Sequence, residues 1–286
     1  MIIIVLSLLL HMMKKVQASV IENYWLLMGK LKIKIPDLKE FLDEKASKYE
    51  SPSFIKDDPI LIPHQFKDKR DIEISAFITS IISWGNRKSI INSSKNIMSY
   101  MDHSPYDFII NHTKKDLTNT DKSIHRTFNM IDLNYFIISL RNIYENYGGI
   151  EDIISDKKNG SNIQERISSF KKIFFSLEHP HRSKKHLPSP IDGSSAKRFN
   201  MFLRWMVRSN EKGVDFGVWK KIRTSELSIP LDVHTGKIAR DLGLLSRNQN
   251  DSRSVEEIDI KLRKMDHVDP VKYDYALFGL GVYEKF

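Results

Sequence analysis

Apolar residues recur at helical spacing along much of this 286-residue chain, and this pattern limits the folds open to it. Several stretches carry apolar side chains three and four positions apart, which is the period of one face of an α-helix. They include Ile74, Phe77, Ile78, Ile81 and Ile82; Phe199, Phe202, Leu203, Met206 and Val207; and Ile238, Ala239, Leu242 and Leu245. Strand-like alternation is scarce. The sequence therefore predicts an all-α fold.

Polar and proline-rich segments separate the predicted helices. The longest covers residues 179–193 and contains three prolines. Proline and glycine interrupt helices, so such a stretch is typical of a loop. Because this loop lies in the middle of the helical region, we expect it to divide the helices into an earlier and a later set.

The amino terminus differs from the rest of the chain. Residues 2–10 are almost all apolar, but a bilayer-spanning helix needs about 20 residues. A signal peptide carries its basic residues before the apolar run, whereas Lys14 and Lys15 follow it. We interpret residues 1–27 as a non-structural extension and expect one folded domain over residues 28–286, with Met28 as the true start. A signal or membrane anchor is the alternative.

Composition excludes several kinds of site. The chain has no cysteine, which removes disulfides, thiolate zinc sites, iron–sulfur clusters and cysteine nucleophiles. His179, His181 and His186 lie near one another but have no acidic partner at metal-binding spacing, so we expect neither a metal nor a cofactor. The net charge of +9 permits a nucleic-acid partner. The absence of cysteine fits the reducing cytoplasm, and we expect no membrane partner.

A basic helix is predicted directly after the long loop. Glycine allows a tight turn, serine is a good N-cap, and the N–H groups at a helix start bind phosphate. On a helical wheel Lys197, Arg204 and Arg208 share one face, opposite the apolar face. This pattern predicts an exposed basic stripe that contacts DNA, with an ordinary solvated surface as the alternative. The predicted contacts are Gly193, Ser194, Ser195, Arg198, Arg204 and Arg208.

The most informative stretch is PLDVHTGKIARDLGLL, which begins at Pro230. A proline precedes an aspartate, and an amphipathic helix follows. Asp232 is therefore predicted to lie at a helix N-terminus, where its carboxylate accepts backbone N–H bonds. From the residues alone, Asp232 is either a catalytic group or an ordinary N-cap.

This stretch resembles the P-V-D-x-H-x-x-R-I-x-x-R-L-G-L segment of helix-hairpin-helix DNA glycosylases, the superfamily of endonuclease III and the 8-oxoguanine glycosylases. The resemblance implies that Asp232 is the catalytic carboxylate. The superfamily's preceding hairpin, L-P-G-[VI]-G-x-K-x-A, has a partial counterpart at residues 187–196, with Gly193 at the second glycine and Lys197 at the lysine. The first glycine is missing. Lys197 and Asp232 are 35 positions apart, a wide separation that the archaeal 8-oxoguanine glycosylase branch also shows.

A second match lies upstream, at residues 77–86 (FITSIISWGN). It resembles the helix end that begins the glycosylase domains, but the glutamine that fills the gap in the DNA stack is absent. Trp84 or Asn86 would take its place, and Arg87 would touch a phosphate. The chain from about Leu31 also resembles a conserved bacterial family that shares KRFNMFLRWMVR, PLDVH and FGLGVYEKF, a resemblance that names no activity.

The glycosylase resemblance implies a two-lobed helical fold and a monomer that binds double-stranded DNA and removes a damaged base. Such a base must leave the stack first, and Asp232 would then stabilise the cationic sugar. Lys197 would either attack the sugar, as an AP lyase does, or contact a phosphate. His234 would orient Asp232 or pack. A non-catalytic DNA-binding protein with the same fold is the alternative. A metal-dependent nuclease would need a cluster of carboxylates, and the sequence shows none.

Overall fold

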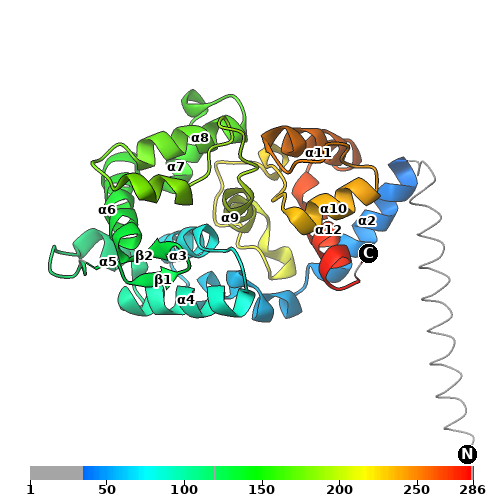
Figure 1. Cartoon of the computed structure of the whole chain (residues 1–286). Coiled ribbons are helices and arrows are strands. Elements are labelled where there is room, and N and C mark those ends of the chain that lie inside the picture. The colour runs from blue at the N-terminus through cyan, green and yellow to red at the C-terminus, as the bar shows by residue number, and fades with distance from the viewer. Residues whose placement is uncertain (1–34, 119, 285) are drawn as a thin grey trace, which may run out of the picture.

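The computed structural model describes residues 35–118, 120–284 and 286, and these residues form a mostly helical protein with one short β-ribbon (Figure 1). The α-helices are α2 (Ile35–Tyr49), α3 (Lys69–Ile81), α4 (Arg87–Tyr100), α5 (Pro105–Asn111), α6 (Met130–Tyr147), α7 (Ile150–Ser155), α8 (Ile163–Phe174), α9 (Lys197–Val207), α10 (Val233–Asp241), α11 (Ser252–Met265) and α12 (Tyr273–Val282). Strands β1 (Ser123–His125) and β2 (Phe128–Asn129) pair antiparallel. The prediction of a mostly helical fold is confirmed.

Short 3-10 helices fill several of the connections between the α-helices. They are η1 (Pro52–Asp57), η2 (Pro59–Leu61), η3 (Pro63–Gln65), η4 (Lys157–Asn159), η5 (His181–His186), η6 (Asn210–Lys212), η7 (Thr224–Glu226) and η8 (Pro270–Lys272). Four of them have proline in the first turn, where its missing N–H costs nothing and its fixed φ suits a helix start.

Asparagine and aspartate side chains begin most of the long helices. Each accepts a hydrogen bond from a backbone N–H of the first turn, which would otherwise lack a partner. These N-cap residues are Asp68 for α3, Asn86 for α4, Asn129 for α6, Asn162 for α8, Asp232 for α10 and Asp251 for α11. Local sequence therefore sets where these helices begin.

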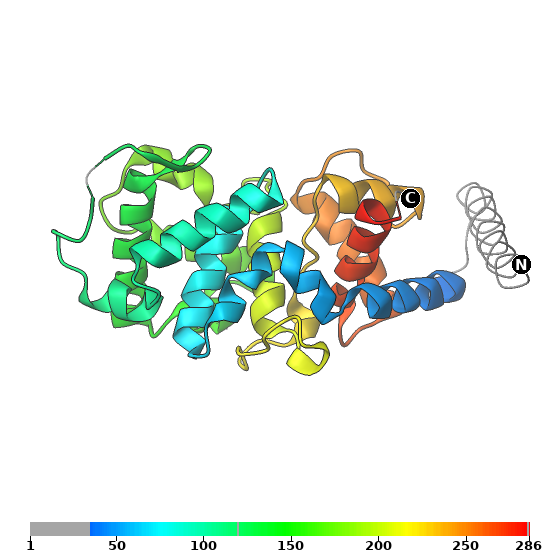
Figure 2. The ribbon, with the colours of Figure 1, turned by 90° about the horizontal axis from the view of Figure 1, so that it is seen from below.

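The described residues form two hydrophobic cores. The larger core is formed by the helices from α3 through α9. Within it, the Phe77 ring contacts the rings of Phe136, Phe170, Phe174, Phe199 and Phe202. The smaller core joins α2, α10, α11 and α12. Figure 2 shows this division from below, with α2 beside the carboxyl-terminal helices. Helix α9, the last α-helix of the larger core, lies at the middle of the view in Figure 1.

The expectation that the loop at residues 179–193 divides the helices is wrong. Helices α8 and α9 flank this loop, yet both contribute to the larger core. The division falls between α9 and α10, and α2 joins the later set because Leu38 and Leu42 pack with Leu277 and Leu280 of α12. A proline-rich loop marks a break in helix, but apolar contacts between distant segments decide which helices share a core.

The predicted extension at residues 1–27, with its Met28 start, lies outside the described residues. Among the helices that the structure describes, none is long and apolar enough to cross a membrane.

Candidate functional site

The two residues predicted as catalytic lie together in the structure. Lys197 is the first residue of α9, and Asp232 is the N-cap of α10. Nζ of Lys197 lies 3.9 Å from Oδ2 of Asp232. The other carboxylate oxygen, Oδ1, accepts a hydrogen bond from the Thr235 N–H at 2.9 Å, which orients the carboxylate. The side chains are 28% and 26% exposed, so the pair is accessible to a ligand.

The turn before α9 brings these two helix starts together. Gly193 has φ +93°, which suits glycine, and Ser194 pairs with Asp251 in an isolated β-bridge. The Ser195 hydroxyl donates to the carbonyl of Leu231, the residue before Asp232, at 3.3 Å. This bond ties the start of α9 to the start of α10 across a long stretch of sequence.

The predicted serine N-cap of α9 is wrong. Ala196 occupies the N-cap position, in the left-handed region with φ +48° and ψ 32°, and no side chain caps the helix there. A non-glycine residue in this region is strained. The N–H groups of the first turn of α9, beside Lys197, are therefore left without a side-chain acceptor, and the positive end of the helix dipole is uncovered.

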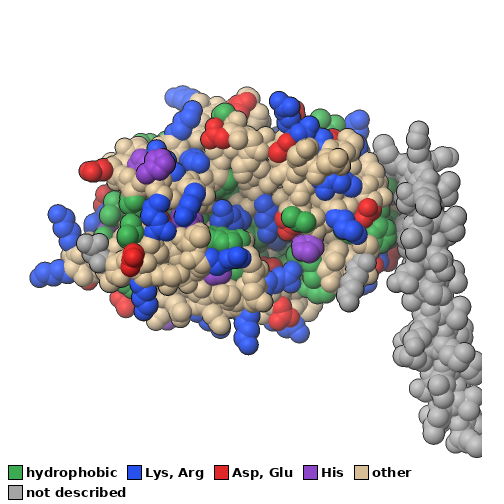
Figure 3. All heavy atoms as spheres, viewed as in Figure 1, with side chains coloured by type: hydrophobic (Ala, Val, Ile, Leu, Met, Phe, Trp, Pro, Cys, Tyr) green, Lys and Arg blue, Asp and Glu red, His purple; other side chains and the backbone are tan. Residues whose placement is uncertain are grey.

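A cavity of about 920 Å³ opens beside the Lys197–Asp232 pair, and we call it the central cavity. Its aromatic walls come from Phe54, Trp84, Tyr275 and Phe278. The charged side chains that line it are Asp58, Arg87, Lys197, Arg198, Arg204, Asp232 and Asp274, together with His234. Figure 3 shows Lys and Arg side chains gathered around a hollow in the middle of one face, with apolar atoms inside it. The cavity thus offers flat apolar surfaces and a positive rim.

Trp84 forms part of a wall of this cavity. It is partly buried, with the Arg198 guanidinium 4.8 Å from its ring centroid and the His186 ring stacked at 6.0 Å. Arg198 itself donates to the Ile81 and His186 carbonyls, and burial lowers the pKa of Arg198 to about 10. Both side chains are held in place by the protein, so neither projects freely towards a DNA stack.

Arg87 and His234 line the central cavity, and Asn86, which precedes Arg87 in the chain, does not. Asn86 is exposed and caps α4 by accepting from the Ser89 N–H at 3.2 Å. The Arg87 guanidinium lies 4.7 Å from the Phe278 ring centroid. His234 is exposed, and within the described part of the chain no hydrogen bond joins it to Asp232. The sequence predicts that His234 orients Asp232 or packs. The structure instead leaves its side chain exposed.

The predicted exposed stripe on α9 is wrong beyond Lys197. The Arg204 and Arg208 side chains are only 4% and 6% exposed. Arg208 pairs with Glu50 and Asp215 at 2.7 Å and with Asp269 at 2.8 Å. Burial alone lowers the pKa of a guanidinium, but these carboxylates outweigh it and raise the pKa of Arg208.

Arg204 belongs to the same buried network. It pairs with Asp274, and with Asp215 at 3.4 Å. We therefore remove Arg204 and Arg208 from the residues expected to contact DNA. A helical wheel places them correctly on one face, but it cannot show that four acidic residues from other parts of the chain cover that face.

Two carboxyl groups of the central cavity were missed by the sequence reasoning. Burial raises the pKa of Asp274 to about 6, although Arg204 and Lys197 act against it. Burial also raises the pKa of Asp58. The only sequence signal was a charged residue beside apolar ones: Asp274 stands between two tyrosines at the start of an apolar helix, and Asp58 precedes Pro59 and Ile60.

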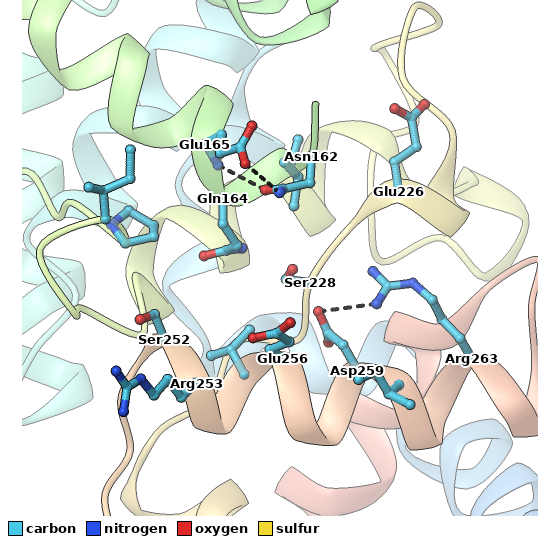
Figure 4. A pocket seen from close by; sticks show the side chains of 15 residues that line it. Asn162, Gln164, Glu165, Glu226, Ser228, Ser252, Arg253, Glu256, Asp259 and Arg263 are labelled. Atoms are coloured by element: carbon cyan, nitrogen blue, oxygen red, sulfur yellow. Dashed lines mark hydrogen bonds and ion pairs between the residues drawn. The ribbon is translucent and has the colours of Figure 1, made fainter. Parts of the chain in front are cut away.

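A second cavity of about 460 Å³ lies between the start of α8, the turn before α9 and helix α11 (Figure 4). Its charged lining is mainly acidic: Glu165, Glu226, Glu256 and Asp259 against Arg253 and Arg263. Several of these groups are already engaged, since Glu226 pairs with Arg166 at 2.7 Å and Asp259 with Arg263 at 3.5 Å. An acidic lining repels phosphate, so the central cavity is the stronger candidate site.

Fold and site together define a mostly helical protein with a lysine–aspartate pair beside an aromatic-walled cavity. In the part of the chain that the structure describes, no cluster of three histidine, aspartate or glutamate residues is suited to a metal ion. The chain belongs to the family described as "Protein of unknown function (DUF2400)", whose model matches residues 58–283. No curated protein and no solved structure gave a match.

Proposed function

We propose that this protein is a DNA glycosylase that breaks the N-glycosidic bond of a damaged base in double-stranded DNA, with a two-lobed fold of the helix-hairpin-helix glycosylase type. The observation that carries the proposal is the 3.9 Å approach of Lys197 Nζ to Asp232 Oδ2 beside the central cavity. An amine and a carboxylate next to a cavity large enough to admit a base are the groups that base excision requires. The protein would act as a monomer on the DNA of the cytoplasm.

Charge supports DNA as the partner. The chain carries a net charge of +9, and Lys and Arg side chains surround the hollow at the centre of one face (Figure 3). The first turn of α9 lacks a side-chain cap beside Lys197, and free N–H groups at a helix start bind phosphate. A phosphate bound there would bring the adjoining sugar close to Lys197 and Asp232.

The shape of the central cavity supports an extruded base. An enzyme that acts on a base in a duplex must take it out of the stack, and aromatic walls stack on the extruded base. Phe54, Trp84 and Phe278 provide such walls. The base would enter the cavity while its sugar stays at the mouth, where the Asp232 carboxylate stabilises the positive charge that develops as the bond to the base breaks.

Lys197 adds a covalent route. Its uncharged amine would form a bond to C1′ while the C1′–N bond to the base breaks, so that the base leaves with the bonding electrons and takes up a proton. Opening of the sugar ring, with a proton added to the ring oxygen, then gives an imine between Nζ and C1′. Asp232 lies close enough to accept the proton that the amine loses. Borohydride supplies hydride to such an imine and makes the link permanent.

The test is an excision assay with the full-length protein. Duplexes that carry 8-oxoguanine, uracil, an oxidised pyrimidine, an alkylated purine or an abasic site are each incubated with the protein, with and without borohydride. Base release from at least one duplex supports the proposal. A trapped adduct in addition assigns the covalent route to Lys197, and release without an adduct leaves Asp232 as the catalyst of direct hydrolysis.

Three variants interpret the result. Asp232→Asn keeps a side-chain oxygen for the Thr235 N–H and therefore keeps the N-cap, yet it should lower excision by a factor of about 100 or more. Lys197→Ala should abolish trapping. Lys264→Ala removes an exposed lysine of α11 that does not line the cavity, and it should trap like the wild type. Equal excision by Asp232→Asn and the wild type would remove Asp232 from the mechanism.

A non-catalytic DNA-binding protein is the second candidate. It is favoured by Asn86, which stands where the glycosylases carry the stack-filling glutamine and whose side chain is occupied as the cap of α4. This candidate predicts duplex binding that weakens steeply as salt rises, with no base released from any duplex. That outcome would replace the glycosylase proposal.

A further inference from the structure

Asp58 is a buried carboxylate of the central cavity, and one of its two oxygens has no partner among the described residues. It is the N-cap of η2, and its Oδ1 accepts from the Ile60 N–H at 3.0 Å. The side chain is only 8% exposed. Oδ2 has neither a hydrogen bond nor an ion pair within the described part of the chain, yet it is not sealed away from solvent. Asp58 lines the central cavity, and Oδ2 is the oxygen that it has left for a molecule bound there.

The other two carboxylates of the cavity are already engaged. Asp232 accepts from the Thr235 N–H and lies beside Lys197. Asp274 is paired with the buried Arg204. Among these three carboxylates, Asp58 is therefore the one that has no ion-pair partner in the described part of the chain.

The surroundings of Asp58 favour a ligand that donates a hydrogen bond. Burial raises the pKa of Asp58, and the Ile60 N–H and the charges of Arg204, Arg87 and Lys197 offset this only in part. A buried carboxylate with one unused oxygen is costly unless a donor reaches it. A ligand N–H aimed at Oδ2 would supply that donor.

Flat apolar surfaces lie next to this acceptor. Phe54, four residues before Asp58, contacts Tyr275 and Phe278 edge to face, with ring centroids 5.5 and 5.7 Å apart. All three rings line the central cavity. An acceptor at the edge of an aromatic-walled cavity suits a planar heterocycle, whose faces stack while its edge donates.

We propose that Asp58 is the specificity-determining residue of the central cavity and that it selects bases that carry an exocyclic amino group. This inference rests on the proposed function, in that the cavity takes an extruded base. An amino group donates to Oδ2, whereas a carbonyl oxygen in the same place is repelled by it. Uracil has one N–H on its pairing edge, but two carbonyl oxygens flank it. Cytosine and adenine differ from uracil and hypoxanthine by an amino group in place of a carbonyl, so these are matched probes.

The test measures binding of the free bases to the full-length protein by ligand-observed NMR titration, with no excision required. The wild type should bind cytosine more tightly than uracil, and adenine more tightly than hypoxanthine, by about tenfold or more, the scale of a hydrogen bond to a charged group. Asp58→Asn keeps an oxygen for the Ile60 N–H and turns an amide donor into the cavity. It should therefore reverse both preferences.

Two further variants keep the test decisive. Asp57→Asn makes the same change of charge at the neighbouring, exposed carboxylate, and it should keep the wild-type preference. Asp58→Ser can still cap η2 but is too short to reach a base, so it should lose the preference without reversing it. Thermal unfolding shows whether each variant is folded, and Asp58→Ser replaces Asp58→Asn if the latter is not.

Each outcome bears on the inference separately from the proposed function. Reversal in Asp58→Asn supports the inference even if no duplex is cleaved, in which case only the glycosylase proposal fails. A wild type that binds no base, or binds the members of each pair equally, overturns the inference. So does an Asp58→Asn variant that keeps the wild-type preference. If excision is found in either of these cases, the glycosylase proposal stands without Asp58.

Discussion

The two ends of helix α9 carry basic residues on one face but place them in opposite surroundings. Lys197, at the amino end, is 28% exposed and lies 3.9 Å from one carboxylate beside an open cavity. Arg208, the C-cap at the other end, is 6% exposed and contacts three carboxylates at 2.7 to 2.8 Å. The same helical stripe therefore supplies a group free to act on a ligand and a group enclosed by the protein.

The two ends differ in the number of carboxylates that contact the basic residue. The Arg208 end collects carboxylates from the end of α2, from the segment after α9 and from the loop before η8. Together they satisfy the guanidinium and join the two cores. Among the described residues, Lys197 has one ion-pair partner, Asp232, and Asp232 is shared with the backbone of α10. A buried charge that is fully paired holds a structure together, whereas a partly paired, accessible charge is available for chemistry.

The largest expected effect is at the enclosed end. Arg208→Met would leave the Glu50 and Asp269 carboxylates without their cation and Asp215 with Arg204 alone. Breaking such a buried network by removing one partner costs about 3 to 5 kcal/mol. Urea unfolding, followed by circular dichroism, should show a loss of this size in the free energy of unfolding. A loss below about 1 kcal/mol would mean that the network is not a structural element.

A pH-dependent effect is expected in the middle of the helix, where Arg204 meets Asp274. Burial raises the pKa of Asp274 to about 6, against an ordinary value of 3.8. The folded state therefore holds this proton more tightly than the unfolded state. The stability that it contributes is complete below about pH 4 and is lost as the pH rises through about 6.

Asp274→Asn removes this titration. The free energies of unfolding of the wild type and the variant are measured at intervals from pH 4 to pH 7. As the pH rises, the wild type should lose stability relative to the variant. Asp259, whose pKa burial also raises to about 6, is present in both proteins, so its contribution cancels in the difference. A difference that does not change with pH would contradict the prediction.

A smaller effect is expected where the segment between α9 and α10 packs on the larger core. The Trp219 indole N–H donates to Glu73 Oε2 at 2.6 Å, and Tyr144 and the Ile150 N–H bind Oε1. Trp219→Phe would leave a buried carboxylate oxygen without its donor, at a cost of about 1 to 3 kcal/mol. Denaturant unfolding of the variant measures this cost.

Trp205→Phe is the matched control. Trp205 is fully buried, and its indole nitrogen has no hydrogen-bond partner among the described residues. The two substitutions remove the same volume from the same core, but only one of them breaks a hydrogen bond. Trp219→Phe should therefore be the more destabilising change, and the reverse order would show that packing, not the bond to Glu73, holds the segment between α9 and α10 in place.

The sequence predicted the features that depend on nearby residues. Apolar spacing located the helices around Phe77 and Phe199, and the proline before Asp232 located the start of α10. The motif resemblance singled out Lys197 and Asp232, which the structure brings together although 35 positions separate them. Features of this kind can be predicted because the helical period and the N-cap are local properties.

The features that depend on distant residues could not be predicted in this way. No sequence pattern around Arg208 predicts its ion pair with Glu50, which lies far away in sequence. Asp58 reaches the central cavity only because the segment after α2 folds against α9 and α12. Ala196 occupies a left-handed N-cap that the sequence assigned to a serine. Burial and tertiary packing decide all three cases.

The smallest expected effect on stability is at the open end of α9, and it completes the comparison. Lys197→Met repeats the substitution made at Arg208, on the same helix, but removes a partly exposed amine whose single carboxylate partner is 3.9 Å away. Exposed pairs contribute at most about 1 kcal/mol, and Asp232 keeps its bond to the Thr235 N–H. Urea unfolding should therefore differ little from the wild type, while the affinity for duplex DNA falls. A loss as large as that of Arg208→Met would show that both ends of α9 are structural, and Lys197 would then no longer be a candidate for catalysis.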